Sequence, residues 1–411
     1  MIIDDNYKTI NEIKDNLIKH FDKVYGNSEN VKVYFAPGRV NLIGEYTDYN
    51  GGHVLPCSLS IGTYCAVKLR DDSQVRLKSL NFCDTDIIHV DLKELQYKEE
   101  HDWANYPKGM IKTLMDNGYS IPNGFDILFY GNIPNGAGLS SSASIEVLTG
   151  YVLKDMFGFE FDMVQLAVYG RMAENQYIGV NCGIMDQFAV AMGQANNAIF
   201  LNTSTLNYSY VPLELGSYKI LIMNTNKRRG LKDSKYNERR KECEEALKLI
   251  RREYEKQCIK IDDLNDLCSI TMDEWENVKI SIVDEILYKR AQHVITENER
   301  TIEAIKVLEQ GDLISFGKLM TASHMSLKND YEVTGIELDT LVETALRCKG
   351  VLGARMTGAG FGGCAIALVE EGYIEEVVSE VGKSYNEKTG LLADFVVVEI
   401  GNGPCKIKAL R

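Results

Sequence analysis

The chain has 411 residues, more than one compact hydrophobic core usually serves, so its length predicts two domains. Hydrophobic residues make up 45% of the sequence and charged residues 25%, as in ordinary globular proteins. With 45 basic and 59 acidic residues the net charge is −14, and such an acidic surface argues against a nucleic acid or an anionic membrane as a partner.

The N-terminal half of the sequence predicts helices and strands in mixed order. Helical spacing of apolar residues predicts an amphipathic helix over residues 7–25, one face of which carries Ile10, Ile13, Leu17, Ile18 and Phe21. "VKVYFAPG" predicts a strand that ends at Pro37-Gly38. Residues 53–69 predict an interrupted strand, and "GFDILFYGNIP" predicts a strand before a glycine- and serine-rich loop. Residues 142–158 predict a helix, and Asp162 is expected to cap another helix that runs to Gly179.

Two strands are predicted near the middle of the chain, "AIFLNT" and "YKILIMNTN". Residues 231–310 are highly charged and predict helices. Residues 353–369 predict a strand pair, residues 374–390 a helix, and "ADFVVVEI" a final strand. We expect a boundary near 205–220, and so divide the chain into domains 1–215 and 216–411.

Targeting and redox signals are weak. The N-terminus shows no secretion signal, and no apolar run approaches the ~18 residues of a membrane helix. The ten cysteines form no C-x-x-C pair and no zinc spacing with the six histidines, so we expect reduced, buried thiols. These features favour a cytoplasmic protein.

The loop "IPNGAGLSSSASIE", residues 133–146, has features of a phosphate-binding loop. It precedes a predicted helix, whose N-terminus attracts anions through free N–H groups and a partial positive charge. Gly136 and Gly138 permit close approach of the backbone, and four serines add hydroxyl donors, one of which could ligate Mg²⁺. The lysine that ends the P-loop signature is missing, and a glycine turn with serine caps is the alternative interpretation of this segment alone.

If the loop holds phosphate, a metal ion and an arginine must replace the missing lysine. Glu174 is a candidate metal ligand, because it lies in line with Ala167, Arg171 and Ile178 on the predicted 162–179 helix. That stripe would face inward, where an acid is uncommon without a partner. A half-exposed helix acid is the alternative.

Two further segments concentrate polar side chains. "APGRVNLIGEYTDYNGG", residues 36–52, gathers Arg39, Glu45, Asp48 and Asn50 among glycines, a pattern that favours a polyhydroxylated ligand such as a sugar. A polar turn cluster is the alternative. In "NCGIMDQFAVAMG", residues 181–193, Asp186 lies among apolar residues, where a carboxylate needs a hydrogen bond or a cation to stay ionised. A catalytic acid and a structural cap both fit this spacing.

The stretch "GAGFGG", residues 358–363, matches the dinucleotide fingerprint G-x-G-x-x-G. That fingerprint must join a strand to a helix, whereas here the predicted strand "CAIALV" follows. We therefore reject a nicotinamide site and expect a glycine hairpin that lies close to another backbone or to phosphate.

Taken together, these segments resemble the galactokinases of the GHMP small-molecule kinase family. The resemblance spans nearly the whole chain. It is carried by "PGRVNLIGEYTDYNGG", "NGAGLSSSAS", "RMTGAGFGGCAIALV", "NTNKRRGLKDSKYNERRKECEEAL", "HVITENERT" and "DYEVTGIELDTLVE".

The resemblance implies an α/β (α+β) chain with the two-domain GHMP kinase fold, in which helices flank mixed and antiparallel sheets and the active site lies in the interdomain cleft. It implies ATP-dependent phosphorylation of galactose at the anomeric hydroxyl, with ATP and Mg²⁺ as cofactors. The expected partners are the sugar and ATP, without nucleic acid or membrane, and no oligomeric partner is indicated.

The resemblance also implies roles for individual residues. Asp186 would lie at the reacting hydroxyl, as base or as orienting group, and Arg39 beside it would stabilise developing negative charge. The remaining residues would bind ligands: Glu45, Tyr46, Asp48, Gly183, Asp186 and Tyr236 the sugar; Gly136, Ala137, Gly138, Leu139, Ser140, Ser141 and Ser142 the phosphates; Trp103 and Tyr106 the adenine; and Ser142 and Glu174 the Mg²⁺.

Tyr46 departs from the family signature, which has histidine at this position. We expect either a slightly reshaped pocket or a side chain that points elsewhere, and we expect Tyr46→His to retain activity. Alternatives are a kinase for N-acetylgalactosamine or another sugar, and a non-catalytic sensor that binds galactose and ATP. A kinase for mevalonate or homoserine fits less well, because the sugar signature is present.

Overall fold

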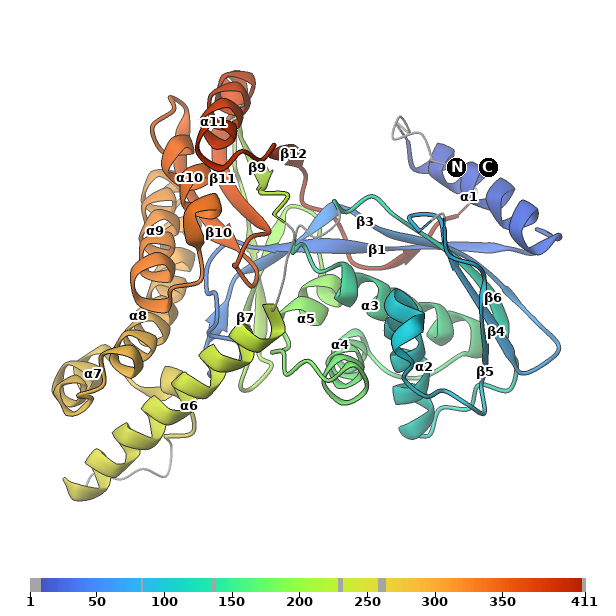
Figure 1. Ribbon diagram of the computed structural model, residues 1–411, viewed down its shortest axis with the longest axis horizontal. Helices are drawn as coiled ribbons and strands as arrows, with labels where there is room; N and C mark the ends of the chain where they lie inside the picture. The colour runs from blue at the N-terminus through green and yellow to red at the C-terminus, as the bar shows by residue number, and fades with distance from the viewer. Residues whose placement is uncertain (1–8, 83, 135–137, 228–231, 258–263, 409–411) are drawn as a thin grey trace.

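A computed structural model describes residues 9–82, 84–134, 138–227, 232–257 and 264–408 (Figure 1). Within these residues the strands form sheets of six, four and three strands. In the six-stranded sheet, β4 pairs parallel with β6 and the other strand pairs are antiparallel. This confirms the predicted α/β (α+β) class with mixed and antiparallel sheets. The six strands, in the order β13-β1-β3-β6-β4-β5, are β13 (Cys405–Lys406), β1 (Lys32–Asn41), β3 (Pro56–Leu69), β6 (Phe125–Gly131), β4 (Gln74–Ser79) and β5 (Ile88–Asp91).

Helices cover both faces of the six-stranded sheet. Side chains alternate between the two faces along each strand, so neighbouring residues of one strand pack in different layers. Val33 and Tyr64 pack with α1 on one face, whereas Tyr34 and Cys65 belong to the larger core on the other. The two layers can be followed in Figure 1, where α1 lies on the opposite side of the sheet from α2 and α3. The helices of this half are α1 (Ile10–Tyr25), α2 (Asn105–Asp116), α3 (Ser141–Phe157), α4 (Met163–Met172) and α5 (Met185–Met192).

The predicted N-terminal helix is present as α1, with a capping box between Thr9 and Glu12. Its buried face contains Ile13, Leu17 and Phe21. The assignment of Ile10 to that face was wrong, because its side chain is 58% exposed. Ile10 is the first residue of the helix, one turn before the helix meets the sheet.

The prediction that Pro37-Gly38 ends the first strand was also wrong. Strand β1 continues to Asn41, with a shift in its register against β3 between Pro37 and Arg39. Irregularities of this kind tolerate proline inside a sheet and redirect the side chains that follow. The shift brings the Arg39 N–H within 3.2 Å of the Leu139 carbonyl, so the strand meets the glycine-serine loop here.

The helix capped by Asp162 reaches Gly179, as predicted, but it changes form on the way. The Asp162 carboxylate accepts a hydrogen bond from the Gln165 N–H, α4 ends at Met172, and a π-helical segment, η2 (Ala173–Ile178), completes the run. Such π-helical insertions shift the side chains that follow, and they are frequent at functional sites. Glu174 lies in this segment.

The second half of the chain surrounds a four-stranded antiparallel sheet of order β10-β11-β9-β12. The glycine stretch 358–363 joins β10 to β11 as the expected hairpin, which confirms the rejection of a dinucleotide fingerprint. These strands are β9 (Tyr218–Asn224), β10 (Val351–Thr357), β11 (Cys364–Glu370) and β12 (Asp394–Val398), and the small sheet contains β2 (His53–Val54), β7 (Asn197–Asn202) and β8 (Tyr208–Pro212). The helices are α6 (Lys232–Lys256), α7 (Met272–Val278), α8 (Glu285–Glu309), α9 (Leu313–Ser326), α10 (Gly335–Ala345) and α11 (Ile374–Thr389).

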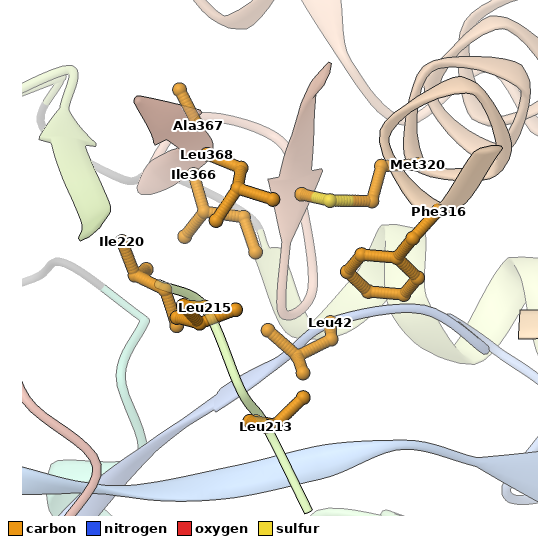
Figure 2. A pocket seen from close by; sticks show the side chains of 9 residues that line it. All are labelled: Leu42, Leu213, Leu215, Ile220, Phe316, Met320, Ile366, Ala367 and Leu368. Carbon is orange, nitrogen blue, oxygen red and sulfur yellow. The ribbon is translucent and has the colours of Figure 1, made fainter. Parts of the chain in front are cut away.

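An apolar layer joins the two halves. Val40 and Leu42, at the end of β1 and just after it, share a core with Ile220 and Ile366 of the four-stranded sheet. This layer contains a void of about 10 Å³ between the sheet and α9 (Figure 2). The void is too small and too apolar to hold a ligand. Its lining residues are Leu42, Leu213, Leu215, Ile220, Phe316, Met320, Ile366, Ala367 and Leu368.

The chain crosses between the halves more than once. After β12 it returns to the six-stranded sheet, where β13 pairs with β1 through Cys405 and Phe35. The division into domains 1–215 and 216–411 therefore stays a prediction. For the site, the consequence is that β1, the glycine-serine loop and the β10–β11 hairpin meet where the two halves join.

Candidate active site

A cavity of about 480 Å³ opens where these segments meet. Many residues predicted from the sequence line it: Arg39, Glu45, Tyr46, Asp48, Tyr106, Gly138, Ser140, Ser141, Ser142, Glu174, Gly183, Asp186 and Tyr236. Further lining residues were not predicted: Tyr97, Ile178, Val180, Cys182, Met185, Gly358 and Ala359. Segments more than 300 residues apart in the sequence therefore share one polar cavity.

The centre of the cavity is an ion pair between Arg39 and Asp186. Arg39 follows the irregularity in β1 and is 3% exposed, while Asp186 lies in the first turn of α5. The Arg39 Nε and Nη2 atoms donate to the two Asp186 carboxylate oxygens, each at 2.8 Å. This two-bond geometry fixes the orientation of both side chains as well as their distance. Both side chains are therefore fixed in place where they line the cavity.

The glycine-serine loop binds to this pair directly. The Arg39 Nη1 atom donates to the Gly138 carbonyl at 2.7 Å, and the Ser140 hydroxyl donates to the Asp186 carboxylate. Ser140 has a φ of 59°, an unfavourable conformation for a residue with a side chain, and α3 begins at the next residue. The N–H groups at the start of α3 are thus next to the ion pair, which is the arrangement that an anion site needs. Gly136 and Ala137 lie outside the described residues.

Two predicted nucleotide contacts do not line the cavity. Leu139 is buried at 1% exposure in the apolar layer, and the Trp103 indole is stacked on Phe82 and packed against Phe129. Tyr106, near the start of α2, does line the cavity, as does Tyr97. The aromatic wall on this side therefore consists of tyrosine rings.

Glu45 anchors residues 36–52, the sugar-signature segment, to the glycine hairpin. One carboxylate oxygen accepts the Gly358 N–H at 2.6 Å and lies 3.5 Å from Arg355, and the other accepts from the Asn41 amide. Burial raises the pKa of Glu45, and Arg355 and Arg39 act against that shift. The carboxylate is thus held in place by the protein before any ligand is bound.

Beneath Glu45, a chain of buried charges continues into α8. Arg355 is fully buried and lies 3.7 Å from Glu297, which accepts from the Arg300 Nε at 2.9 Å and the Ser323 hydroxyl at 2.5 Å. Burial opposes ionisation of Glu297, but Arg300 and the other nearby cations lower its pKa to about 2. Sequence reasoning missed this support, although Arg355 and Glu297 both lie in segments that carried the family resemblance.

Asp48 and Gly183 face one another across the cavity wall. A Cβ atom on Gly183 would lie 1.9 Å from the Asp48 Oδ2 atom, so only glycine fits there. Burial, followed by the nearby charges of Asp186 and Glu45, raises the pKa of Asp48 to about 7. Tyr236, from α6, closes this side of the cavity.

Glu174, one of the two predicted metal ligands, lines the cavity. Its carboxylate accepts from the Gln187 amide at 2.6 Å and from the Ser142 hydroxyl, which brings the two predicted ligands together. Burial, and then the charge of Asp186, raises the pKa of Glu174 to about 7. Within the described ranges, no three His, Cys, Asp or Glu side chains are close enough to hold a metal ion by themselves.

A second acid lies behind Glu174 and was also missed. Glu146 of α3 is fully buried and accepts from the same Gln187 amide group at 3.1 Å. Burial, and then the adjacent charge of Glu174, raise the pKa of Glu146 well above its ordinary value. Helical spacing of apolar residues gave no signal for it, because Glu146 is a charged residue at a buried position of α3.

Tyr46, which departs from the histidine of the family signature, lines the cavity. The ring lies among Tyr49, Tyr236 and Tyr331, at a centroid distance of 4.5 Å from Tyr331. The hydroxyl donates to the Ala359 carbonyl at 2.7 Å. The ring is therefore part of the cavity wall, and the hydroxyl points to the glycine hairpin.

Three family models match the chain, and their positions agree with this geometry. The galactokinase galactose-binding signature covers residues 19–69, the GHMP kinases N terminal domain residues 105–194, and the GHMP kinases C terminal model residues 304–387. Galactokinases from Clostridium beijerinckii and Fusobacterium nucleatum are each 54% identical to the chain. These alignments cover 97% and 96% of this chain, respectively, and 100% of each relative. The chain belongs to the galactokinase family.

Membership of the galactokinase family confirms the resemblance read from the sequence motifs. It makes the chain a GHMP kinase, and the family implies ATP as the phosphoryl donor. A crystal structure of Lactococcus lactis galactokinase complexed with galactose matches with a TM-score of 0.91 and 48% identity, over 96% of this chain and 100% of the other. A crystal structure of mevalonate kinase matches with a TM-score of 0.62 at 20% identity, over 90% of this chain and 99% of the other, which shows the fold alone. In the described part of the chain, every helix is too short or too polar to cross a membrane.

The raised pKa of Asp48 predicts a dependence of stability on pH. A carboxyl with a folded-state pKa near 7 contributes stability that is full below its unfolded pKa and is lost as the pH rises from there through 7. Asp48→Asn should therefore raise the free energy of unfolding relative to the native chain, by about 1–2 kcal/mol at pH 8 after allowance for partial solvation. The gap should widen from pH 5 to pH 8 in thermal unfolding of the ligand-free protein.

Asp116→Asn is the matched control, because Asp116 lies in an exposed ion pair with Lys112. Its stability should follow that of the native chain across the same pH range. A gap for Asp48→Asn that is constant with pH, or that narrows toward pH 8, would contradict the burial argument.

Proposed function

We propose that this chain catalyses the ATP-dependent phosphorylation of galactose at its anomeric hydroxyl, giving galactose 1-phosphate and ADP. The observation that carries the proposal is the Arg39–Asp186 ion pair, which lies in one cavity between the sugar-signature segment and the glycine-serine loop. Phosphoryl transfer depends mainly on positioning and electrostatic stabilisation. A preformed pair at the junction of the two binding regions supplies both.

On the sugar side, we assign the hydroxyl contacts to Glu45, Asp48, Gly183 and Tyr236. Glu45 and Asp48 provide carboxylate acceptors, and Gly183 permits the close approach of backbone and ligand at the Asp48 wall. Tyr46 contributes its ring to this wall, since its hydroxyl already donates to Ala359. A sugar with several adjacent hydroxyls suits a wall of this kind.

At the reaction centre, a bond forms between the anomeric oxygen and the γ-phosphorus while the bond from that phosphorus to the β-phosphate bridging oxygen breaks. Arg39 stabilises negative charge on the transferred group. Both Asp186 oxygens already accept from Arg39, so the carboxylate is fixed in orientation at the reacting hydroxyl. It orients the sugar hydroxyl and receives its proton late, as the new bond to phosphorus forms.

On the nucleotide side, we assign the phosphates to residues 136–142 and the start of α3, and the base to the side lined by Tyr97 and Tyr106. Trp103 does not line the cavity, because its indole is stacked on Phe82 and packed against Phe129. The free N–H groups at the start of α3 and the Ser141 and Ser142 side chains line the cavity where an anion is expected.

The residues present fit Mg²⁺. This ion prefers oxygen ligands and usually takes only one or two carboxylates from the protein, with the remaining positions filled by water and phosphate. Glu174 and Ser142 supply a carboxylate and a hydroxyl in contact with one another, and the Gln187 amide holds the carboxylate from behind. When bound, the ion would offset the negative charge of the phosphates.

We also propose a cytoplasmic location. The eight cysteines within the described ranges form no disulfide, as expected for a reducing compartment.

The proposed function predicts a narrow substrate profile. Purified protein with Mg²⁺-ATP should release ADP rapidly with galactose, and much more slowly with N-acetylgalactosamine, glucose, mevalonate or homoserine. Faster turnover of N-acetylgalactosamine would reassign the substrate. Galactose binding without ADP release would show a non-catalytic sensor.

Asp186→Asn tests the reaction centre. The substitution removes the negative charge at the reacting hydroxyl but leaves the Glu45 and Asp48 wall intact, so kcat should fall by about 10²- to 10⁴-fold while galactose still binds. Steady-state kinetics and calorimetry measure the two effects. Asp48→Asn is the contrasting variant, and should act mainly on the galactose KM. Near-native turnover by Asp186→Asn would remove this residue from the mechanism.

Glu174→Ala tests the metal assignment. Loss of the one carboxylate in the set should raise the Mg²⁺ concentration for half-maximal rate by at least about tenfold, since a charged ligand is lost. Direct titration with Mn²⁺ in the presence of ATP should show the same weakening. The exposed Glu160→Ala variant is the control and should match the native chain. An unchanged metal requirement in Glu174→Ala would assign the ion to other groups.

A further inference from the structure

Tyr46 occupies a constrained position in the cavity wall. Its φ is 68°, in the left-handed region that few residues with side chains adopt, and its side chain is 4% exposed. The ring packs against Tyr331 and Tyr236, and the hydroxyl donates to the Ala359 carbonyl at 2.7 Å. A backbone held in this conformation by so many contacts indicates that the direction of the hydroxyl matters.

The acceptor of this bond belongs to the turn of the β10–β11 hairpin. The preceding residue, Gly358, donates its N–H to Glu45 at 2.6 Å. Consecutive residues of the sugar-signature segment therefore hold consecutive residues of the hairpin, one through a carboxylate and the other through a phenol hydroxyl.

The same hairpin residue touches the phosphate side. A Cβ atom on Gly358, whose φ is 76°, would lie 2.9 Å from the Gly138 carbonyl and 3.7 Å from the Arg39 Nη2 atom. The Gly138 carbonyl in turn accepts from the Arg39 Nη1 atom at 2.7 Å. The hairpin thus fills the space between the sugar-signature segment and the Gly138–Arg39 contact.

We propose that the Tyr46 hydroxyl is a positioning group that fixes the 358–363 hairpin against Gly138 and Arg39, and so sets the geometry of phosphoryl transfer. This inference rests on the proposed function. It assigns the Tyr46 hydroxyl to the hairpin and its ring to the sugar wall. Loss of the hydroxyl should therefore affect the reaction step more than galactose binding, and a histidine at position 46 would lack the phenol hydroxyl that reaches Ala359.

The test is Tyr46→Phe, which removes the hydroxyl and keeps the ring. We expect kcat to fall about tenfold, while the galactose KM stays within about twofold, because one hydrogen bond is lost away from the sugar. Hydrogen exchange, measured by mass spectrometry, should become severalfold faster in peptides that contain residues 357–361. Tyr46→His should show the same exchange increase and a similar fall in kcat, with activity retained.

Tyr49→Phe is the matched control. Tyr49 belongs to the same aromatic cluster, but its hydroxyl bonds to the Tyr331 hydroxyl at 2.7 Å and does not reach the hairpin. It should keep the native kcat and the native exchange at 357–361. If Tyr49→Phe matches Tyr46→Phe in both readouts, the effect belongs to the cluster and the inference is wrong.

The other outcomes are equally decisive. Native kcat and native exchange in Tyr46→Phe would overturn the inference, and so would a raised galactose KM with unchanged kcat, which would place the hydroxyl on the sugar. If the native chain itself fails to phosphorylate galactose, the proposed function fails first. The exchange measurement still decides whether the hydroxyl holds the hairpin.

Discussion

The ion pair between Arg39 and Asp186 is the interaction on which the rest of the site depends. Its two hydrogen bonds join β1 to α5, and the third Arg39 contact joins both to the glycine-serine loop. An isolated buried carboxylate or guanidinium would be costly, whereas a pair with ideal geometry and further hydrogen bonds is stable. The irregularity in β1 is what allows the strand to deliver Arg39 to this point.

The cavity carries more negative than positive charge around this pair. Glu45, Asp48 and Glu174 all have raised pKa values, and burial is the largest cause for each. Arg39 binds Asp186 and Arg355 lies 3.5 Å from Glu45, so an added cation would be favoured most beside Asp48 and Glu174. The raised pKa of Glu174 has a plain physical consequence: a metal ion would stabilise the ionised form that the apo cavity disfavours.

Much of this site could be predicted from the sequence because its residues lie in short, continuous motifs. Arg39, Glu45 and Asp48 occupy one segment, Ser140 to Ser142 another, and the structure brings them into one cavity. The fold class was implied by the family resemblance that the same motifs carry. The rejected dinucleotide fingerprint shows that neighbouring secondary structure decides what a glycine motif means.

The parts that could not be predicted depend on contacts between distant segments. Nothing in the sequence pattern links Glu146 to Glu174, because the Gln187 amide that binds both lies on a third element. The continuation of β1 past Pro37 depends on pairing with β3, which local turn chemistry does not reveal. The Tyr46 hydroxyl finds its acceptor 313 residues away, and only the fold shows why a tyrosine fits there.

The most direct test of this account is a crystal structure of the chain with galactose, Mg²⁺ and a non-hydrolysable ATP analogue. The account predicts that the C1 hydroxyl oxygen lies within hydrogen-bond distance of the Asp186 carboxylate, about 2.6–3.2 Å, with the Arg39 guanidinium beside the terminal phosphoryl group. A complex in which both ligands are ordered but the C1 oxygen lies far from Asp186 and Arg39 would contradict it.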